Sequence, residues 1–196
     1  MNMHKIPYRE YHLFTLLEEY SRQKFPLDLF ISHYFRDHPA LGSKDRLFIA
    51  DTAYALIRWQ SLLDYLSSSS SWQERYQVFL SSEFKVLNNR NDIPPATRVS
   101  FPPLLFDLIV KNYGEERGQE LCLVCNTPAP TTIRVNTLKI SRDDLLKRWN
   151  ELYQVTPTLT SPSGIIFHKK INFFQLPEFK EGLFEVQDEG SQLLAD

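Results

Sequence analysis

Apolar side chains recur every three or four positions through the first third of the chain, which is the spacing of amphipathic helices. One helix is predicted from Tyr11 to Arg22, and a second from Leu27 to Phe35 after Pro26 restarts the pattern. A third is predicted to begin at Ser43, as its N-cap, and to run to Leu62. Because apolar positions cover much of its circumference, this helix is expected to be mostly buried at the centre of a bundle.

Polar, turn-forming residues interrupt this pattern twice. The serine run Ser67–Ser71 is too short for a domain linker and predicts a loop between helices. Apolar positions from Trp72 to Leu87 then continue the bundle. The segment Asn88–Pro95 contains Asn-Asn, Asn-Asp and Pro-Pro pairs, which are typical of turns. We therefore place the boundary of the helical domain near Pro95.

Beyond this boundary the pattern changes from helical to mixed. Pro102 or Pro103 suits the first turn of a helix over 104–112, and Gly114 is expected to end it before a helix over 115–125. β-branched residues predict a short strand around Val135, and Ser141 is expected to cap a helix that runs to Leu152. Further strands are predicted at 153–159, 165–167 and 183–186, before a helical start at 187–195. This order predicts a small α/β region of the kind that RNA-recognition modules use.

The composition limits the classes of protein that fit this pattern. With 42% hydrophobic residues in 196, the chain is not disordered and is long enough for one large or two small domains. Twenty-two basic and 24 acidic residues leave a net charge of −2, so RNA binding would have to come from a local patch. No apolar run approaches the roughly 18 residues that cross a bilayer, and the N-terminus lacks the apolar core of a signal peptide. We expect a soluble, cytoplasmic protein.

Basic side chains are concentrated between Arg134 and Arg148. This stretch holds five basic and two acidic residues, a local charge of +3. A cation and an amide at a strand end suit a phosphate or a base edge, so RNA contact is predicted for Arg134, Asn136, Lys139, Arg142, Lys147 and Arg148. Lys169 and Lys170 are expected to extend the patch. The alternative is that these are ordinary solvated charges, which unchanged RNA affinity after Arg→Glu changes at 134 and 148 would favour.

A cluster of acids and amides lies near the end of the sequence. Asp188 and Glu189 stand at a predicted helix start, where acids suit the helix dipole and Ser191 adds local bonds. Helix capping is therefore one interpretation of the cluster. The other is a docking surface for a further domain, made of Gln187, Asp188, Ser191 and Gln192.

Four short parts of the chain carry a resemblance to a known family. They are Asp45-Arg-Leu-Phe with Tyr54-Ala-Leu-Ile-Arg-Trp59, Ser100-Phe-Pro-Pro, Arg134-Val-Asn-Thr-Leu-Lys139 and Phe184–Asp196. They resemble, in the same order, segments of the Sun/Fmu (RsmB) RNA cytosine-5-methyltransferases. The resemblance implies a mostly α fold: a NusB-like helical RNA-binding domain over 1–95, a helical connector over 96–130 and a small α/β region over 131–196. It also implies that this region leads into an S-adenosylmethionine-binding methyltransferase domain that is missing from the chain.

No catalytic, cofactor-binding or metal-binding residue is predicted in this chain. Cys122 and Cys125 lack the second pair of ligands that structural zinc needs and are expected to be buried helical cysteines. The resembled enzymes use one cysteine after threonine and another after proline, whereas Cys122 follows Leu121 and Cys125 follows Val124. A methyl donor needs a Gly-rich turn after a strand, and none of the six glycines forms Gly-x-Gly.

The expected function is therefore substrate recognition without catalysis. By resemblance, the parent enzyme methylates C5 of cytosine in ribosomal or transfer RNA with S-adenosylmethionine as cofactor, and the partners of this chain are that RNA and its own catalytic domain. Neither a membrane nor DNA is expected as a partner. Two alternatives stay open: a stand-alone NusB-like RNA-binding or antitermination factor, and a helical protein-interaction module.

Overall fold

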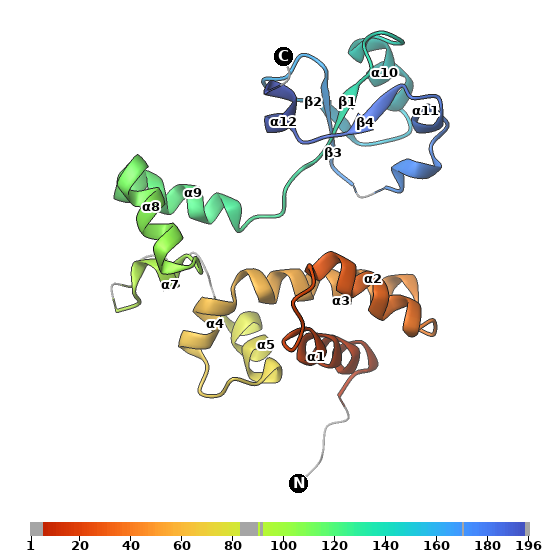
Figure 1. The fold of residues 1–196 in the computed structure, drawn as a ribbon. Helices are drawn as coiled ribbons and strands as arrows, with labels where there is room; N and C mark the ends of the chain where they lie inside the picture. Colours follow the sequence, from red (N-terminus) through yellow and green to blue (C-terminus); the bar gives the residue numbers. More distant parts are fainter. Residues whose placement is uncertain (1–5, 83–89, 91, 170, 195–196) are drawn as a thin grey trace. The chain divides into compact units, whose positions relative to one another are not determined.

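The chain folds into two compact units in a computed structural model that describes residues 6–82, 90, 92–169 and 171–194. The N-terminal unit spans Met1–Thr127 and the C-terminal unit spans Pro128–Asp196 (Figure 1). Each unit has a hydrophobic core of its own. The described part is mostly helical, with one small four-stranded sheet. None of its helices combines the length and apolar character needed to cross a membrane.

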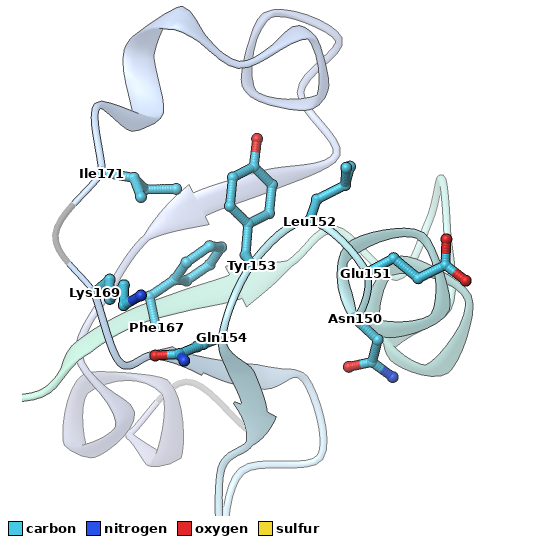
Figure 2. A pocket seen from close by; sticks show the side chains of 8 residues that line it. All are labelled: Asn150, Glu151, Leu152, Tyr153, Gln154, Phe167, Lys169 and Ile171. Carbon is cyan, nitrogen blue, oxygen red and sulfur yellow. The ribbon is translucent and has the colours of Figure 1, made fainter.

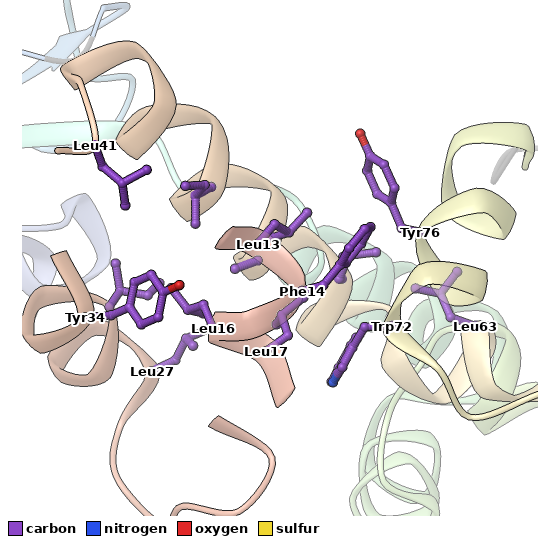
Figure 3. Close-up of a cluster of buried hydrophobic side chains, with 14 residues drawn as sticks. Leu13, Phe14, Leu16, Leu17, Leu27, Tyr34, Leu41, Leu63, Trp72 and Tyr76 are labelled. Atoms are coloured by element: carbon purple, nitrogen blue, oxygen red, sulfur yellow. The ribbon is translucent and has the colours of Figure 1, made fainter. Parts of the chain in front are cut away.

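The N-terminal unit begins with five helices that share one core. Their bounds are α1 (Tyr8–Tyr20), α2 (Leu27–Asp37), α3 (Ser43–Arg58), α4 (Gln60–Leu66) and α5 (Trp72–Ser81). Leu13, Leu16 and Leu17 of α1 are fully buried, and aromatic side chains of α2 and α5 close the core around them (Figure 3). The predicted apolar stripes of the first two helices are thereby confirmed at their leucines.

Short polar contacts fix the ends of these helices. Ser71 caps α5, because its side chain accepts a hydrogen bond from the Glu74 N–H (3.3 Å). The Glu74 carboxylate in turn accepts hydrogen bonds from the Ser68 N–H (2.6 Å) and the Ser69 hydroxyl. The serine run is therefore an ordered loop between α4 and α5, as predicted.

Two predictions about α3 are corrected. Gly42 occupies the cap position and Ser43 is the first helical residue, since Arg46 Nε donates to the Leu41 carbonyl (2.8 Å) and ties down the helix start instead. The helix is central, packing against α1, α2, α4 and α5. However, it is not mostly buried, because Leu47 and Tyr54 are 53% and 37% exposed.

The outcome for the end of the bundle is mixed. Trp72 and Tyr76 are buried as expected, whereas Leu80 is 60% exposed at the last turn of α5. Leu87 and residues 88, 89 and 91 of the turn-rich segment lie outside the described residues.

A smaller helical group completes the N-terminal unit. It contains α7 (Pro95–Arg98), α8 (Pro103–Tyr113) and α9 (Glu115–Cys125), around buried Val99, Phe106 and Cys122. Gly114 ends α8 with a φ of +79°, a left-handed conformation that glycine adopts without strain. Asn126 Nδ2 donates to the Val99 carbonyl (2.6 Å) and joins the end of α9 to α7. The predicted helix starts and stops are confirmed here.

The C-terminal unit is a four-stranded antiparallel sheet with helices. In chain order it contains β1 (Thr131–Val135), α10 (Arg142–Trp149), β2 (Val155–Pro157), β3 (Gly164–Phe167), the 3-10 turn η1 (Phe173–Gln175), α11 (Pro177–Lys180), β4 (Phe184–Val186) and α12 (Glu189–Leu193). The strand order is β2-β3-β1-β4, so β1 lies inside the sheet and β4 at its edge. This is the β-α-β-β-α-β arrangement of the ferredoxin-like motif.

The sheet buries one face against α10. Ile133, Val135, Ile165 and Phe167 alternate toward Leu145 and Trp149, as the period of two of a strand requires. All four predicted strands are present, although β2 is shorter than the expected 153–159. Tyr153 instead packs beside the Trp149 ring, with ring centroids 6.1 Å apart.

Candidate nucleic-acid interface

The end of β1 opens into a pocket of about 300 Å³. It is lined by Arg134, Val135, Asn136, Thr137, Leu138 and Glu185. Arg134 and Glu185 face each other across β1 and β4 in the antiparallel register. The pocket therefore joins the strand end, the loop that follows it and the edge strand. It brings together two of the residues predicted to contact RNA, Arg134 and Asn136.

Asn136 uses its side chain to hold this loop in place. Its Nδ2 donates to the Gly182 carbonyl (2.9 Å), and its Oδ1 accepts a hydrogen bond from the Leu138 N–H (3.3 Å). Lys139 Nζ donates to the Glu181 carbonyl (2.6 Å), which binds the same loop to the turn before β4. Asn136 and Lys139 are thus anchors, and the loop they fix presents Leu138 with 96% of its surface exposed.

Arg142 joins the start of α10 to the turn between β2 and β3. Its NH1 donates to the Ser161 carbonyl (3.2 Å), and its Nε lies 3.9 Å from the Asp143 carboxylate. Nε itself is buried and has no hydrogen-bond partner among the described residues. Arg142 is therefore mainly an internal anchor of this turn.

Lys147 and Arg148 lie away from this group, in the last turn of α10. Both are exposed, and Lys147 Nζ is 3.7 Å from the Asp144 carboxylate. The six predicted RNA-binding residues therefore do not form a single patch. Arg134, Asn136, Lys139 and Arg142 surround the end of β1, whereas Lys147 and Arg148 mark the opposite end of α10.

A second hollow of about 380 Å³ begins where α10 ends. Figure 2 shows the side chains that line it, which are Asn150, Glu151, Leu152, Tyr153, Gln154, Phe167, Lys169 and Ile171. Lys169, expected to extend the basic patch, belongs to this hollow. Lys170 lies outside the described residues.

The polar cluster near the chain end is largely internal to the unit. Asp188 caps α12 by accepting a hydrogen bond from the Gly190 N–H (3.1 Å), which confirms the capping interpretation for this residue. The Glu189 carboxylate accepts the N–H groups of Ser161 (2.9 Å) and Thr160 (2.7 Å), and these bonds hold the pKa of Glu189 below its ordinary value.

Gln192 is fully buried in the same unit. Its Oε1 accepts the Ser161 hydroxyl proton (2.7 Å), and its Nε2 donates to the carbonyls of Ile133 (3.2 Å) and Gln187 (2.9 Å). Of the four residues proposed for docking, Asp188 and Ser191 are exposed, Gln187 is half-buried and Gln192 faces the interior.

The two cysteines differ from each other in exposure. Cys122 is buried, and burial raises the pKa of its thiol above the ordinary value, whereas Cys125 is exposed at the end of α9. The expectation of two buried cysteines is therefore wrong for Cys125, because the helix turns this position toward solvent. No group of potential metal ligands occurs among the described residues.

Several lining residues were not anticipated from the sequence. Glu185 could have been found from strand alternation, since it is on the same sheet face as Arg134. No sequence pattern predicts that Tyr153 and Phe167 lie together, because their ring contact depends on how the end of α10 packs against β3.

Comparison with known proteins connects this region with methyltransferases. Residues 101–173 match the model of the RsmF/B-like methyltransferase ferredoxin-like domain. The chain is 30% identical over 123 residues to a probable ribosomal RNA small subunit methyltransferase B of Synechocystis sp., covering 62% of this chain and 27% of that protein. It is 32% identical over 103 residues to the ribosomal RNA small subunit methyltransferase B of Pseudomonas putida, covering 52% and 23%. It thus spans about a quarter of these curated relatives.

Among solved structures, the chain is similar to a methyltransferase homolog protein from Pyrococcus horikoshii. The two are 30% identical, with a TM-score of 0.41, and the alignment covers 47% of this chain and 31% of that one.

Proposed function

We propose that the chain recognises RNA for a ribosomal RNA methyltransferase, since residues 101–173 match the model of the RsmF/B-like methyltransferase ferredoxin-like domain. One observation carries the proposal. Within the matched region, Arg134 lines a pocket at the end of β1, and Asn136 and Lys139 hold the adjoining loop in one position. A guanidinium beside a fixed loop suits a phosphate group, because little order is lost when the phosphate binds.

The finer proposal concerns the reaction of the whole protein. We propose that it methylates C5 of cytosine in small-subunit ribosomal RNA in the cytoplasm, with S-adenosylmethionine as methyl donor and transfer RNA as the alternative substrate. The residues of this chain do not fit the donor, since they contain no Gly-x-Gly turn. We therefore assign donor binding and methyl transfer to a separate domain, which would dock on the exposed Asp188 and Ser191.

The helices α1–α5 have a proposed role in the same recognition. We propose that they form a NusB-like RNA-binding domain and that α7–α9 connect it to the ferredoxin-like region. Support comes from the single core that all five helices share. Their surface would then supply RNA contacts additional to those of the C-terminal unit.

RNA binding by the full chain tests the proposal. Arg134→Gln is preferred to a glutamate change, because a carboxylate at 134 would face Glu185 across the strands. We expect Arg134→Gln and Arg148→Gln each to weaken binding of single-stranded RNA and to reduce its salt slope by about 0.7. Fluorescence anisotropy at several salt concentrations measures both. Lys111→Gln, an exposed lysine of α8, is the matched control and should leave affinity unchanged.

The other outcomes separate the alternatives. Affinity that neither arginine change alters would move recognition to the helical unit, as a stand-alone NusB-like factor requires. Absence of RNA binding even at low salt would favour a protein-interaction module. Transfer of labelled methyl groups by this chain alone would contradict the assignment of donor binding to a separate domain.

A further inference from the structure

The hollow at the end of α10 has the size and lining of a small-ligand site. Its volume of about 380 Å³ lies in the range of natural ligand pockets, roughly 300–1,000 Å³. In Figure 2 the ring of Tyr153 lies at the centre of the lining side chains. Phe167, which is 4% exposed, forms part of the apolar floor, and Leu152 and Ile171 add aliphatic surface. A flat aromatic ligand can therefore stack on the Tyr153 ring and contact the apolar floor.

Polar groups surround this apolar centre. Asn150 and Gln154 contribute amides, and Lys169 contributes a cation. Their side chains, like the Tyr153 hydroxyl, make no hydrogen bond within the part of the chain that the structure describes. They differ in this from Asn136, Lys139 and Arg142, whose polar atoms already bind backbone carbonyls. The donors and acceptors around the hollow are thus available to a ligand.

One cation in the lining of the hollow suits an anionic group of a ligand. Lys147 and Arg148 precede Asn150 in the last turn of α10, and Lys169 lies on the rim. Glu151 is the one carboxylate in the lining. The lining therefore holds one cation, Lys169, and one carboxylate, whereas Lys147 and Arg148 lie outside it and Lys147 faces Asp144 (3.7 Å). Lys169 is the lining group that attracts a phosphate.

The open face of the sheet offers no comparable place for a base. RNA-recognition modules stack bases on aromatic side chains of this face. Here the corresponding positions of β1 are Thr132 and Arg134, with Ile166 and Glu185 beside them. Thr132 is 4% exposed, and α12 packs along β1, where Gln192 bonds the Ile133 carbonyl. An unstacked base would therefore have to find an aromatic partner elsewhere in the unit.

We propose that this hollow binds one unstacked nucleotide of the RNA, with the base against Tyr153 and the phosphate at Lys169. Asn150 and Gln154 supply the amides that hydrogen-bond the edge of the base. The inference rests on the proposed RNA-recognition function and adds a site to the Arg134 pocket. The two sites lie at opposite ends of α10, so one single strand that contacts both would run along this helix.

A pair of RNA probes tests the site by nuclear magnetic resonance of the full chain. The first probe is a single-stranded RNA decamer of mixed sequence, and the second is an abasic decamer that keeps the sugar and phosphate groups. We expect the intact decamer to shift the amide signals of Gln154 and Lys169 and the ring signals of Tyr153. The abasic decamer should leave the Tyr153 ring unshifted, because nothing stacks on it.

Substitutions test the same site by affinity. Tyr153→Leu keeps an apolar side chain on the core and removes the ring, so affinity for the intact decamer should fall about fivefold or more. Lys169→Gln should reduce the salt slope by about 0.7. Lys180→Gln, an exposed lysine of α11 outside the hollow, is the matched control and should alter neither quantity. An unchanged pattern of amide signals in each variant verifies that the unit is folded.

The outcomes distinguish this inference from the proposed function. RNA that shifts the signals of Thr137 and Leu138 but none around Tyr153 would overturn the nucleotide site and leave the proposed function standing. A folded Tyr153→Leu protein with unchanged affinity would do the same. If the decamer does not bind the chain at all, both proposals fail together.

Discussion

Gln192 shows how much one buried side chain contributes to the C-terminal unit. Its amide bonds the Ser161 hydroxyl and the carbonyls of Ile133 and Gln187, and so joins α12 to the β2–β3 turn and to β1. All of its surface is buried. Buried polar groups that lose their partners cost free energy, so these bonds are expected to matter for stability.

Replacing the Gln192 amide with an apolar side chain of similar size tests this contribution. Gln192→Leu should lower the free energy of unfolding by about 1–3 kcal/mol, because the buried Ser161 hydroxyl loses its acceptor and the Ile133 carbonyl loses the Gln192 donor. Urea unfolding monitored by hydrogen exchange in residues 128–194 measures the loss. Ser191→Ala, at the exposed neighbouring position, should change stability by less than about 0.5 kcal/mol. Equal losses in the two variants would contradict this role for Gln192.

The sequence predicts the hydrogen bonds of some of these side chains and not those of others. Capping by Asp188 is local, since its partner is Gly190, and it could be predicted from a helix start. The partners of Gln192 at Ser161 and Ile133 are 31 and 59 residues away. Nothing in the polar segment around Gln192 indicates that its amide is buried, so the sequence favours a role at the surface.

Two serines at helix starts allow a matched test of helix capping. The Ser141 hydroxyl accepts the Asp144 N–H (3.2 Å) and donates to the Asp144 carboxylate (2.6 Å), whereas Ser43 makes no capping bond. Ser141→Ala should therefore cost about 1 kcal/mol of stability, and Ser43→Ala close to nothing. Chemical denaturation of both variants measures the difference. A loss at Ser43 equal to that at Ser141 would show that the loss does not come from the capping bond.

The same substitution affects an acid titration. The hydroxyl of Ser141 is the main cause that holds the pKa of Asp144 below its ordinary value, with Lys147 adding to it. A lowered folded pKa contributes stability above the unfolded pKa, which is lost as the pH falls through the folded value. In Ser141→Ala, the pKa of Asp144 should rise toward its ordinary value, and this part of the acid sensitivity should decrease.

The sequence predicted the ends of helices correctly where the residue at the end sets its own backbone conformation or caps the helix. Ser141, Gly114 and Pro103 each stand at the predicted end of a helix, because capping, positive φ and a fixed φ act on the residue itself. The start of α3 did not follow, because Arg46 reaches back to the Leu41 carbonyl and shifts the cap to Gly42. That contact depends on the turn before the helix.

For the whole molecule, two separate cores predict two separate responses to a cavity. Leu16 and Leu145 are both fully buried, one in each unit. Leu145→Ala should lower the stability of the C-terminal unit by about 2–5 kcal/mol, and Leu16→Ala should do the same for the N-terminal unit. Hydrogen exchange measured by mass spectrometry assigns each loss to peptides of one unit. Faster exchange throughout the chain in either variant would mean that the two units unfold together.

The sequence by itself determined most of the elements and their order. One helix was predicted from Ser43 to Leu62, whereas the structure has α3 ending at Arg58 and α4 beginning at Gln60. Helical periodicity predicted the first helices, and β-branched runs between turns predicted the four strands, because both patterns depend on neighbours within a few positions. Its motifs also indicated the methyltransferase family that residues 101–173 match. The interpretation of Arg134 as a binding residue followed from its position at the end of a strand.

Only the tertiary structure decided which side chains lie together. The antiparallel sheet places β1 between β3 and β4, so Arg134 faces Glu185 and Asn136 bonds the Gly182 carbonyl, 46 residues away. The chain direction of α10 separates Lys147 and Arg148 from Arg134, although all three lie within fifteen positions of sequence. The hollow around Tyr153 arises where this helix ends above β3. Contacts between distant segments depend on the packing of whole elements, which no local pattern of residues records.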